Sequence, residues 1–212
     1  MPALKIEVVA DVVCPWCYLG YARLKEALKL RPDIKADISW RAYQLGPDLP
    51  AEGGDYKKLM AQKFDPARMA EIQSHMKEMG ADLGLDFNFD KITLSPNTNA
   101  AHRLIYWAAE EGKLEAVAMG VMHAYFTEGK FIGDLKILTD IAEAAGMDRA
   151  VVERKFRDHE GKDRIATDLA KNDAEAVHAV PYYIIGGKVR VEGSLPPEDL
   201  AEEIDKALQK AA

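Results

Sequence analysis

The stretch that decides the fold covers residues 4–29 and reads LKIEVVADVVCPWCYLGYARLKEALK. At its start, Leu4, Ile6 and Val8 alternate with charged residues, which is the period of two that is typical of a β-strand. From Cys17 onward the apolar side chains are spaced four, three and four residues apart, which is typical of an α-helix. The sequence therefore predicts a strand that leads into two cysteines and a helix that begins at them.

The rest of the chain continues this alternation around a long helical block. Residues 37–45 alternate apolar and polar side chains and predict a second strand. Residues 182–191, with Gly-Gly in the middle, predict a β-hairpin, and a helix opened by proline follows them. Between about residue 49 and residue 161 the apolar side chains recur with helical spacing almost throughout. This order of elements predicts an α/β protein with a large all-helical insertion.

One helix of the insertion has a methionine-rich stripe. The pair Asp65-Pro66 supplies a cap and a first-turn proline, so we expect a helix to begin there. Its apolar side chains follow at helical spacing and are Met69, Ile72, Met76 and Met79. Methionine-rich stripes serve as adaptable peptide-binding surfaces in some proteins. An apolar stripe on a helix is more often buried, so we expect this one to belong to the core.

The composition excludes several classes of protein. Apolar residues make up 48% and charged residues 30%, a balance typical of folded globular proteins. No apolar run approaches the roughly 20 residues of a membrane-spanning helix. The formal net charge of -7 disfavours binding to nucleic acid. Because the first residues lack the pattern of a secretory signal, we expect a cytoplasmic protein with neither a membrane nor a nucleic-acid partner.

The chain has two cysteines, Cys14 and Cys17, which are too few for a disulfide scaffold. A thiol at the start of a helix lies beside unpaired N–H groups and the positive end of the helix dipole, which stabilise a thiolate. A second thiol one turn further on can attack a mixed disulfide formed on the first. We therefore interpret Cys14 as an exposed nucleophile and Cys17 as the resolving thiol, with Pro15 suited to the first helical position.

Inert thiols and a metal site are the alternatives for this cysteine pair. A structural zinc site needs four ligands, and the chain has no further cysteine. Its five histidines come from separate segments, so they could complete a site only if the fold brought them together. We expect redox chemistry at the pair, with no metal and no required cofactor.

The motif Cys14-Pro15-Trp16-Cys17, the helical insertion and Val180-Pro181 before the hairpin resemble the DsbA family of thioredoxin-fold oxidoreductases. Residues 11–20, 97–103 and 124–126 look like the FrnE-like branch of that family, which is related to 2-hydroxychromene-2-carboxylate isomerases and kappa-class glutathione transferases. The resemblance implies a thioredoxin-like domain made of residues 1–48 and 162–212. Residues 49–161 would form the helical insertion domain.

The resemblance also implies which residues surround the cysteines. Pro181 matches the cis-proline that faces the cysteine pair in thioredoxin folds, and the backbone of Val180 would then pair with an extended substrate. Pro15 and Trp16 would complete this substrate-binding set. The secondary candidates for the cleft are Asp11, Asn97, Thr98, His102 and Arg103, of which Asn97 and Thr98 serve equally well as a plain helix cap. The first strand lacks the buried acid of several relatives, since Val8 has the inward position and Asp11 is the nearest carboxylate.

The expected activity is thiol:disulfide exchange with thiol- or disulfide-containing proteins or small thiols. The related isomerases and kappa transferases generally have serine where this chain has Cys14, so the resemblance favours a dithiol cycle. Glutathione is a possible co-substrate. One alternative is a glutathione-dependent isomerase or transferase that acts on a small molecule, and another is a redox-sensing or chaperone-like binding protein. The substrate, the direction of electron flow and the oligomeric state stay open at this point.

Overall fold

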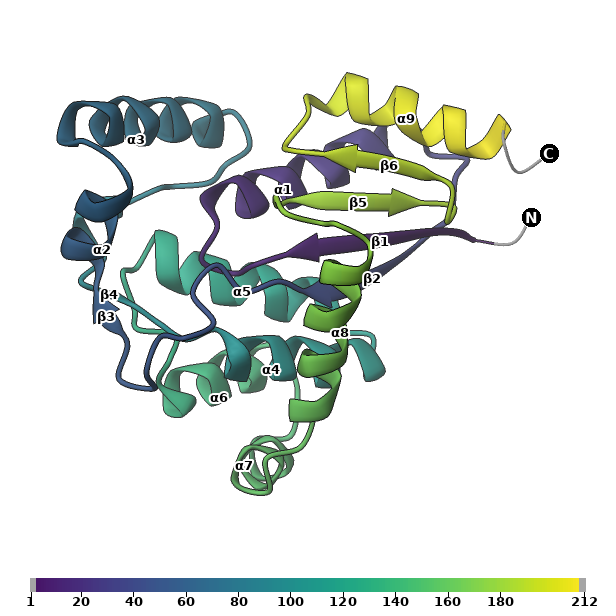
Figure 1. The fold of residues 1–212 in the computed structure, drawn as a ribbon. Coiled ribbons are helices and arrows are strands. Elements are labelled where there is room, and N and C mark those ends of the chain that lie inside the picture. The colour runs from purple at the N-terminus through teal and green to yellow at the C-terminus, as the bar shows by residue number, and fades with distance from the viewer. Residues whose placement is uncertain (1–2, 210–212) are drawn as a thin grey trace.

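A four-stranded mixed sheet forms the centre of the computed structural model, which describes residues 3–209 (Figure 1). The strand order is β2-β1-β5-β6. β1 (Leu4–Ala10) runs parallel to β2 (Ala36–Ala42) and antiparallel to β5 (Tyr182–Ile185), which is antiparallel to β6 (Val189–Glu192). β1 is therefore an inner strand, and the cysteine motif follows it directly.

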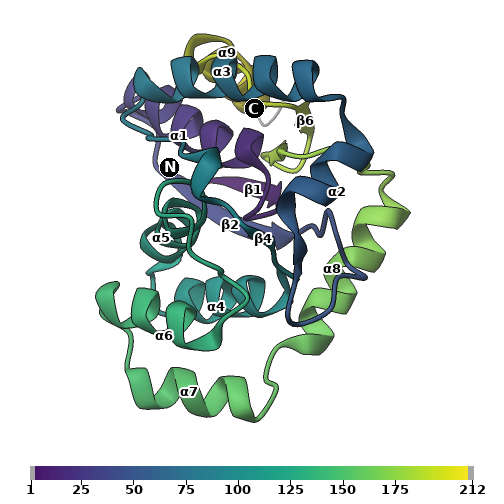
Figure 2. The same cartoon turned by 90° about the vertical axis from the view of Figure 1, so that its left-hand side faces the viewer.

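Helices cover both faces of this sheet. α1 (Pro15–Lys29) joins β1 to β2 and packs against α9 (Pro197–Gln209). α8 (Lys162–Ala174) contacts β2 and lies on the other side of the sheet from α1, as Figure 1 and Figure 2 show. This arrangement confirms the predicted thioredoxin-like order of strand, helix and strand followed by a hairpin and a helix.

The segment between β2 and α8 folds mostly into helices. They are α2 (Tyr56–Lys63), α3 (Pro66–Ala81), α4 (Asn99–Glu110), α5 (Leu114–Phe126), α6 (Leu135–Ala144) and α7 (Arg149–Arg157). Within residues 3–209, no helix has both the length and the apolar character needed to cross a membrane. The domain boundaries expected at residues 48 and 162 stay a prediction, since α8 packs on both β2 and α4.

The insertion is not wholly helical, contrary to the sequence-based prediction. β3 (Gly54–Asp55) and β4 (Leu94–Ser95) pair as a short antiparallel ladder, and a 3-10 helix, η1 (Phe89–Lys91), precedes β4. Strands of two residues are too short to show a period of two, so the apolar pattern could not reveal them. The ladder brings the chain just before α2 beside the chain just before α4.

A buried arginine links α8 to the sheet. The Arg41 side chain on β2 is 1% exposed, and its guanidinium pairs with Glu7 on β1 and with Glu175 directly after α8. The Asn172 side chain of α8 also donates a hydrogen bond to the carbonyl oxygen of Ala42, at 2.8 Å. Removing either carboxylate would leave a buried charge less well paired, so this cluster holds α8 in place.

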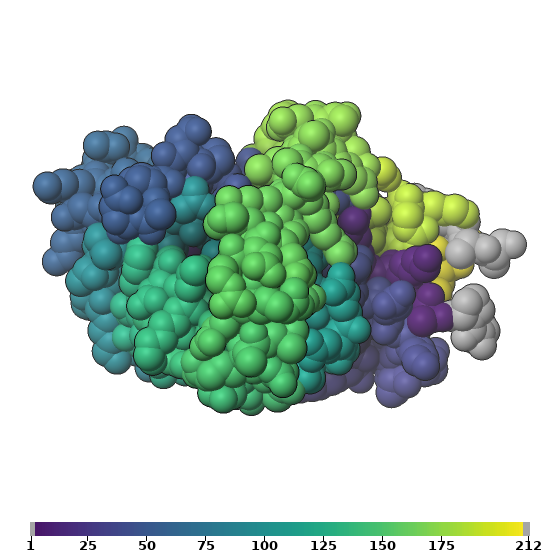
Figure 3. All heavy atoms as spheres, turned by 90° about the horizontal axis from the view of Figure 1, so that it is seen from below, coloured from purple at the N-terminus to yellow at the C-terminus, as the bar shows by residue number. Residues whose placement is uncertain are grey.

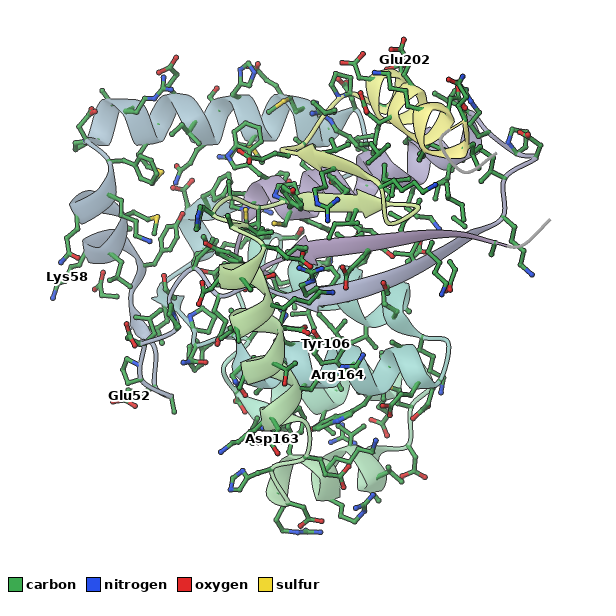
Figure 4. All side chains as sticks on the ribbon, turned by 45° about the vertical axis from the view of Figure 1, so that its right-hand side comes forward. Glu52, Lys58, Tyr106, Asp163, Arg164 and Glu202 are labelled. Carbon is green, nitrogen blue, oxygen red and sulfur yellow. The ribbon has the colours of Figure 1, made fainter. Side chains whose placement is uncertain are left out.

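The same helix also contacts α4. The Arg164 guanidinium carbon lies 4.0 Å from the centre of the Tyr106 ring, and Figure 4 shows the two side chains beside each other. In the view from below, α7 and α8 form one green surface across the middle of the molecule, with the blue helices α2 and α3 on the left and the yellow α9 on the right (Figure 3). α8 therefore joins the two parts of the fold as well as connecting them in sequence.

Candidate active site

The two cysteines lie where the chain passes from β1 to α1. Cys14 is the N-cap residue of α1, and Pro15 is its first residue. The Cys14 carbonyl oxygen accepts hydrogen bonds from the backbone N–H groups of Cys17, at 3.0 Å, and Tyr18, at 3.2 Å. No side chain caps the free N–H groups of the first turn. Cys14 therefore lies at the helix end that favours negative charge.

The two thiols are neighbours in unequal surroundings. Cys14 and Cys17 are both free and approach each other to 3.3 Å. Cys14 is 4% exposed and Cys17 is 1% exposed, so the prediction of an exposed Cys14 is wrong. Cys14 instead forms part of the wall of a cleft, and Cys17 does not. Burial, followed by the neighbouring Cys14 side chain, raises the pKa of the Cys17 thiol well above its usual range.

The Val180–Pro181 segment lies against the cysteines, although it is 166 residues further along the chain. The Val180–Pro181 peptide bond is cis, as the resemblance implies. The Cys14 thiol donates a hydrogen bond to the Val180 carbonyl oxygen, with 3.6 Å between sulfur and oxygen. The backbone N–H of Gly193 donates to the Pro181 carbonyl oxygen at 2.8 Å, which ties the segment to the end of β6. The fold thus holds Val180 beside the first thiol.

An apolar cleft of about 500 Å³ opens beside Cys14. Pro15, Trp16 and Val180 line it on the side of the thioredoxin-like sheet. The opposite wall comes from the insertion, with residues of α2, α3 and α5 that include Leu59, Met69, Ile72 and Phe126. Trp16 is 37% exposed, so a substrate that enters the cleft meets an aromatic ring beside the thiol.

The polar side chains of this cleft mostly bond to one another. The Tyr125 hydroxyl interacts with Ser95, and the Tyr56 hydroxyl interacts with Gln73. Lys63 is the single charged residue among those that line the cleft in residues 3–209. An occupant would therefore gain most of its binding free energy from apolar contact.

The prediction that the methionine stripe is core is only partly right. Met76 is fully buried, whereas Met69 and Ile72 are half-buried and line the cleft. The first turns of α3 face the cleft beside Cys14, so the side chains at the start of the stripe line the cleft while Met76 is buried in the core. The helical period could not distinguish a side chain that faces a cleft from one that faces a core.

Asp11 and His102 form a buried polar pair behind the cysteines. Both side chains are fully buried, and Asp11 accepts hydrogen bonds from the Leu45 backbone N–H at 2.8 Å and from His102 Nε2 at 3.2 Å. His102 Nδ1 accepts a hydrogen bond from Trp40 Nε1 at 3.1 Å, so we assign the tautomer that carries its proton on Nε2. His102 Nε2 also lies 2.9 Å from the Tyr43 carbonyl oxygen.

This pair fixes the loop that precedes the cysteine motif. The backbone N–H of Cys14 donates to the Asp11 carbonyl oxygen at 3.1 Å, so the same residue holds the motif and the chain after β2. Asp11 acts on the Cys17 pKa in two opposite ways: a hydrogen bond from its backbone lowers that pKa, and the negative charge of its side chain, a smaller effect, raises it. Asp11 and His102 support the site from behind and are not among the residues that line the cleft.

The other secondary candidates also lie outside the cleft lining. The Asn97 side chain donates to the Leu49 carbonyl oxygen at 2.8 Å, and its oxygen accepts from the Asn99 backbone N–H at 3.0 Å. Thr98 is the N-cap residue of α4, but its side chain makes no capping hydrogen bond. Of these two residues, Asn97 is therefore the one whose side chain satisfies a backbone group of the helix start.

Arg103 points to the end of α7. Its Nε donates to the Glu160 carbonyl oxygen at 2.5 Å, and its guanidinium lies over the Trp107 ring at 5.3 Å. The side chain is 4% exposed. Arg103 thus packs α4 against the α7–α8 connection and contacts neither cysteine.

Comparison with known proteins identifies this arrangement. The DSBA-like thioredoxin domain matches residues 5–205. This chain belongs to that family. A relative of this DSBA-like chain is the uncharacterized protein YwbO of Bacillus subtilis, which is 31% identical over 186 residues, covering 87% of this chain and 88% of the relative.

The solved structures with the same fold include oxidoreductases and an isomerase. A probable DsbA oxidoreductase of Streptomyces coelicolor has a TM-score of 0.89 at 21% identity, covering 98% of this DSBA-like chain and 91% of its own. A 2-hydroxychromene-2-carboxylate isomerase has a TM-score of 0.68 at 18% identity, covering 98% and 96%. The cytosolic disulfide reductase DsbM of Pseudomonas aeruginosa, solved with GSH, has a TM-score of 0.63 at 14% identity, covering 98% and 96%. These neighbours are consistent with the FrnE-like branch inferred from the motifs.

Sequence reasoning missed two parts of the site of this DSBA-like protein. The wall formed by α2 and α3 was missed because the sequence does not reveal how the insertion folds over the motif. Tyr183 on β5 is fully buried, and its hydroxyl lies 2.4 Å from where a Cβ atom on Gly20 would be; it was missed because it lies in the hairpin signal, where an aromatic residue is ordinary. Gly20, one turn after Cys17 on α1, is the available signal, because a glycine inside a helix indicates close packing by a neighbour.

Proposed function

We propose that this DSBA-like protein is a thiol:disulfide oxidoreductase of the DsbA/FrnE type, with Cys14 as the nucleophile and Cys17 as the resolving thiol. The observation that carries this proposal is the pair of free thiols 3.3 Å apart at the uncapped end of α1, of which Cys14 alone lines the cleft. A substrate disulfide can therefore reach Cys14, and Cys17 is placed to attack from behind.

Two exchanges complete the reaction in the direction of substrate reduction. The Cys14 thiolate attacks one sulfur of the substrate disulfide, and the other substrate sulfur leaves as a thiolate. The Cys17 sulfur then attacks Cys14 and releases the first substrate sulfur, which takes up the proton that Cys17 gives up. The substrate disulfide becomes two thiols while the protein dithiol becomes a disulfide. In the cytoplasm, where we place the protein, the thiol pool would favour this direction.

The cleft supports protein or peptide substrates with apolar residues beside the reacting cysteine. Most of its lining is apolar, and its polar side chains largely bond to one another. Glutathione has three charged groups, and Lys63 is the one charged residue in the described lining. A small thiol such as glutathione therefore suits the role of co-substrate at Cys14 better than that of cleft occupant.

A glutathione-dependent isomerase or transferase is the second candidate. It is favoured by the shared fold with the isomerase and by an apolar cleft suited to a small molecule. In such an enzyme Cys14 would contact the adduct, and Cys17 would have no step to perform. The requirement for Cys17 therefore separates the two functions.

The test is turnover by the wild type, Cys14→Ser and Cys17→Ser in an insulin-reduction assay and in a glutathione conjugation assay. We expect insulin reduction to need both cysteines, and Cys17→Ser to accumulate a mixed disulfide on Cys14, detected by mass spectrometry. Conjugation that persists in Cys17→Ser would instead support the transferase. Partner binding without turnover, unchanged in both variants, would support a redox-independent binding protein.

A further inference from the structure

The hydroxyl of Tyr183 is buried within electrostatic reach of both cysteines and has no hydrogen-bond partner. Tyr183 lies on β5 opposite Val8 of β1, and its side chain is fully buried. Within residues 3–209, two buried side-chain polar atoms lack a partner, the Tyr183 oxygen and Arg41 Nε. The Arg41 guanidinium is paired through its other nitrogens, whereas Tyr183 has only this one polar atom. Of these two residues, Tyr183 is therefore the one whose side chain makes no hydrogen bond at all.

The position of this hydroxyl follows from its contacts with α1. A Cβ atom added to Gly20 would lie 2.4 Å from the Tyr183 oxygen and 2.9 Å from Pro181 Cγ. Gly20 is one turn beyond Cys17, and residues three apart share a helix face. The hydroxyl thus fits into the space that a glycine leaves between α1 and Pro181, on the helix face that also holds Cys17.

The unpaired hydroxyl costs stability in the dithiol form. A buried donor without a partner is unfavourable, and phenylalanine would fill the same space without that cost. With a negatively charged sulfur nearby, tyrosine would be more favourable than phenylalanine, because a hydrogen bond to an anion is stronger than one to a neutral acceptor. Burial, followed by the charges of Cys17 and Cys14, raises the pKa of Tyr183, so the hydroxyl keeps the proton that it would donate.

We propose that the Tyr183 hydroxyl donates a hydrogen bond to the Cys17 sulfur when that sulfur becomes negatively charged during disulfide exchange. This inference rests on the proposed dithiol function and adds a residue to it. Tyr183 would act on the second thiol, whose pKa burial raises even though the Asp11 backbone already hydrogen-bonds to its sulfur.

The charge on Cys17 arises in both directions of the reaction. In resolution, Cys17 loses its proton, its sulfur attacks Cys14, and the bond from Cys14 to the substrate breaks. In reduction of the protein disulfide, a thiolate attacks Cys14 and the bond to Cys17 breaks, so the electron pair of that bond leaves with the Cys17 sulfur. A donor at Cys17 therefore lowers the barrier both to resolution and to the reverse step.

The test is the rate of resolution as a function of pH in the wild type and in Tyr183→Phe. A mixed disulfide between Cys14 and thionitrobenzoate is formed, and the release of thionitrobenzoate by Cys17 is followed by its absorbance. We expect Tyr183→Phe to slow release at neutral pH roughly tenfold, the loss of about one charge-assisted hydrogen bond. The pH at which release is half-maximal should move upward. Alkylation of Cys14 by iodoacetamide should keep its wild-type rate.

Two further measurements separate this role from a structural one. Tyr183→Phe should unfold at the same urea concentration as the wild type or a higher one, because it removes an unpaired donor. The matched control is Tyr182→Phe, which removes a hydroxyl from the neighbouring position of β5, where side chains point to the opposite face. It should leave the rate and the pH profile of release unchanged.

Three results would overturn the inference. The first is a wild-type rate and pH profile of release in Tyr183→Phe, and the second is the same loss in Tyr182→Phe. The third is a lower urea midpoint with an unchanged pH profile, which would mean that the hydroxyl only supports the fold. If the wild type itself forms no Cys14–Cys17 disulfide on release, the proposed function fails rather than the role of Tyr183.

Discussion

The two sides of the cysteine pair differ in chemistry. Cys14 faces an apolar cleft whose far wall comes from the helical insertion. Cys17 faces the interior, where Asp11, His102 and Tyr183 supply polar groups. One helix turn thus separates two chemical tasks. The outer side can bind apolar parts of a substrate, and the inner side can govern the charge of the second sulfur.

The two thiols should differ most in how fast each one, present alone, reacts with an alkylating agent. Cys17→Ser leaves only Cys14, and Cys14→Ser leaves only Cys17. Because Cys17 is buried and its pKa is raised, we expect iodoacetamide to modify Cys14 on the order of 100-fold faster at pH 7. The ratio of the two alkylation rates should fall as the pH rises, since a larger fraction of Cys17 becomes thiolate. Mass spectrometry follows both reactions, and equal rates at pH 7 would contradict the assignment of roles.

Substitution of Asp11 should disrupt the buried hydrogen bonds on the Cys17 side. Asp11→Ala removes the acceptor of the Leu45 backbone N–H and one partner of His102, so we expect a loss of about 2 kcal/mol in the free energy of unfolding. Asp11→Asn is the matched control, because its side-chain oxygen can still accept from Leu45 and should preserve part of the stability. Urea unfolding measures both variants. Equal stability of Asp11→Ala and the wild type would show that the buried pair does not support the site.

Substitution of Ile72, which lines the cleft, should weaken substrate binding on the Cys14 side. Ile72→Asp places a charge against apolar surface, so we expect kcat/KM for a disulfide peptide with leucine beside its cysteine to fall about tenfold. Ala70→Asp puts the same charge on an exposed position of α3 and serves as the control. The reaction of Cys14 with a small disulfide should keep its rate in both variants. A similar loss in Ala70→Asp would point to overall charge instead of the cleft.

The sequence could predict the parts of the molecule whose signals are local. The alternation before Cys14, the helical spacing after it and the hairpin with Gly186 and Gly187 are patterns within ten to twenty residues. The motif and Pro181 connected the two halves through their resemblance to a known family. These signals were enough for the sheet, for α1 and for the family.

The sequence could not predict contacts that depend on how the insertion folds. His102 reaches Asp11 across 91 residues, and its hydrogen bond from Trp40 fixes a tautomer that no local pattern encodes. The burial of Cys14 also depends on a distant segment, because the Val180 carbonyl oxygen, 166 residues away, accepts a hydrogen bond from its thiol. Packing of distant segments determines these features, and one sequence contains no direct record of it.

The position of β5 in the chain has a consequence for biosynthesis. The Val180 carbonyl that accepts from Cys14 is 166 residues away, and the strand that completes the inner side of the site begins at Tyr182. A ribosome makes the chain from its N-terminus, so both cysteines emerge long before β5 exists. Contacts between such distant segments form slowly, because a long loop must close first. While its last strands are still being made, the chain therefore holds both cysteines without Val180 and Tyr183, and it acquires the complete site only when β5 has paired with β1.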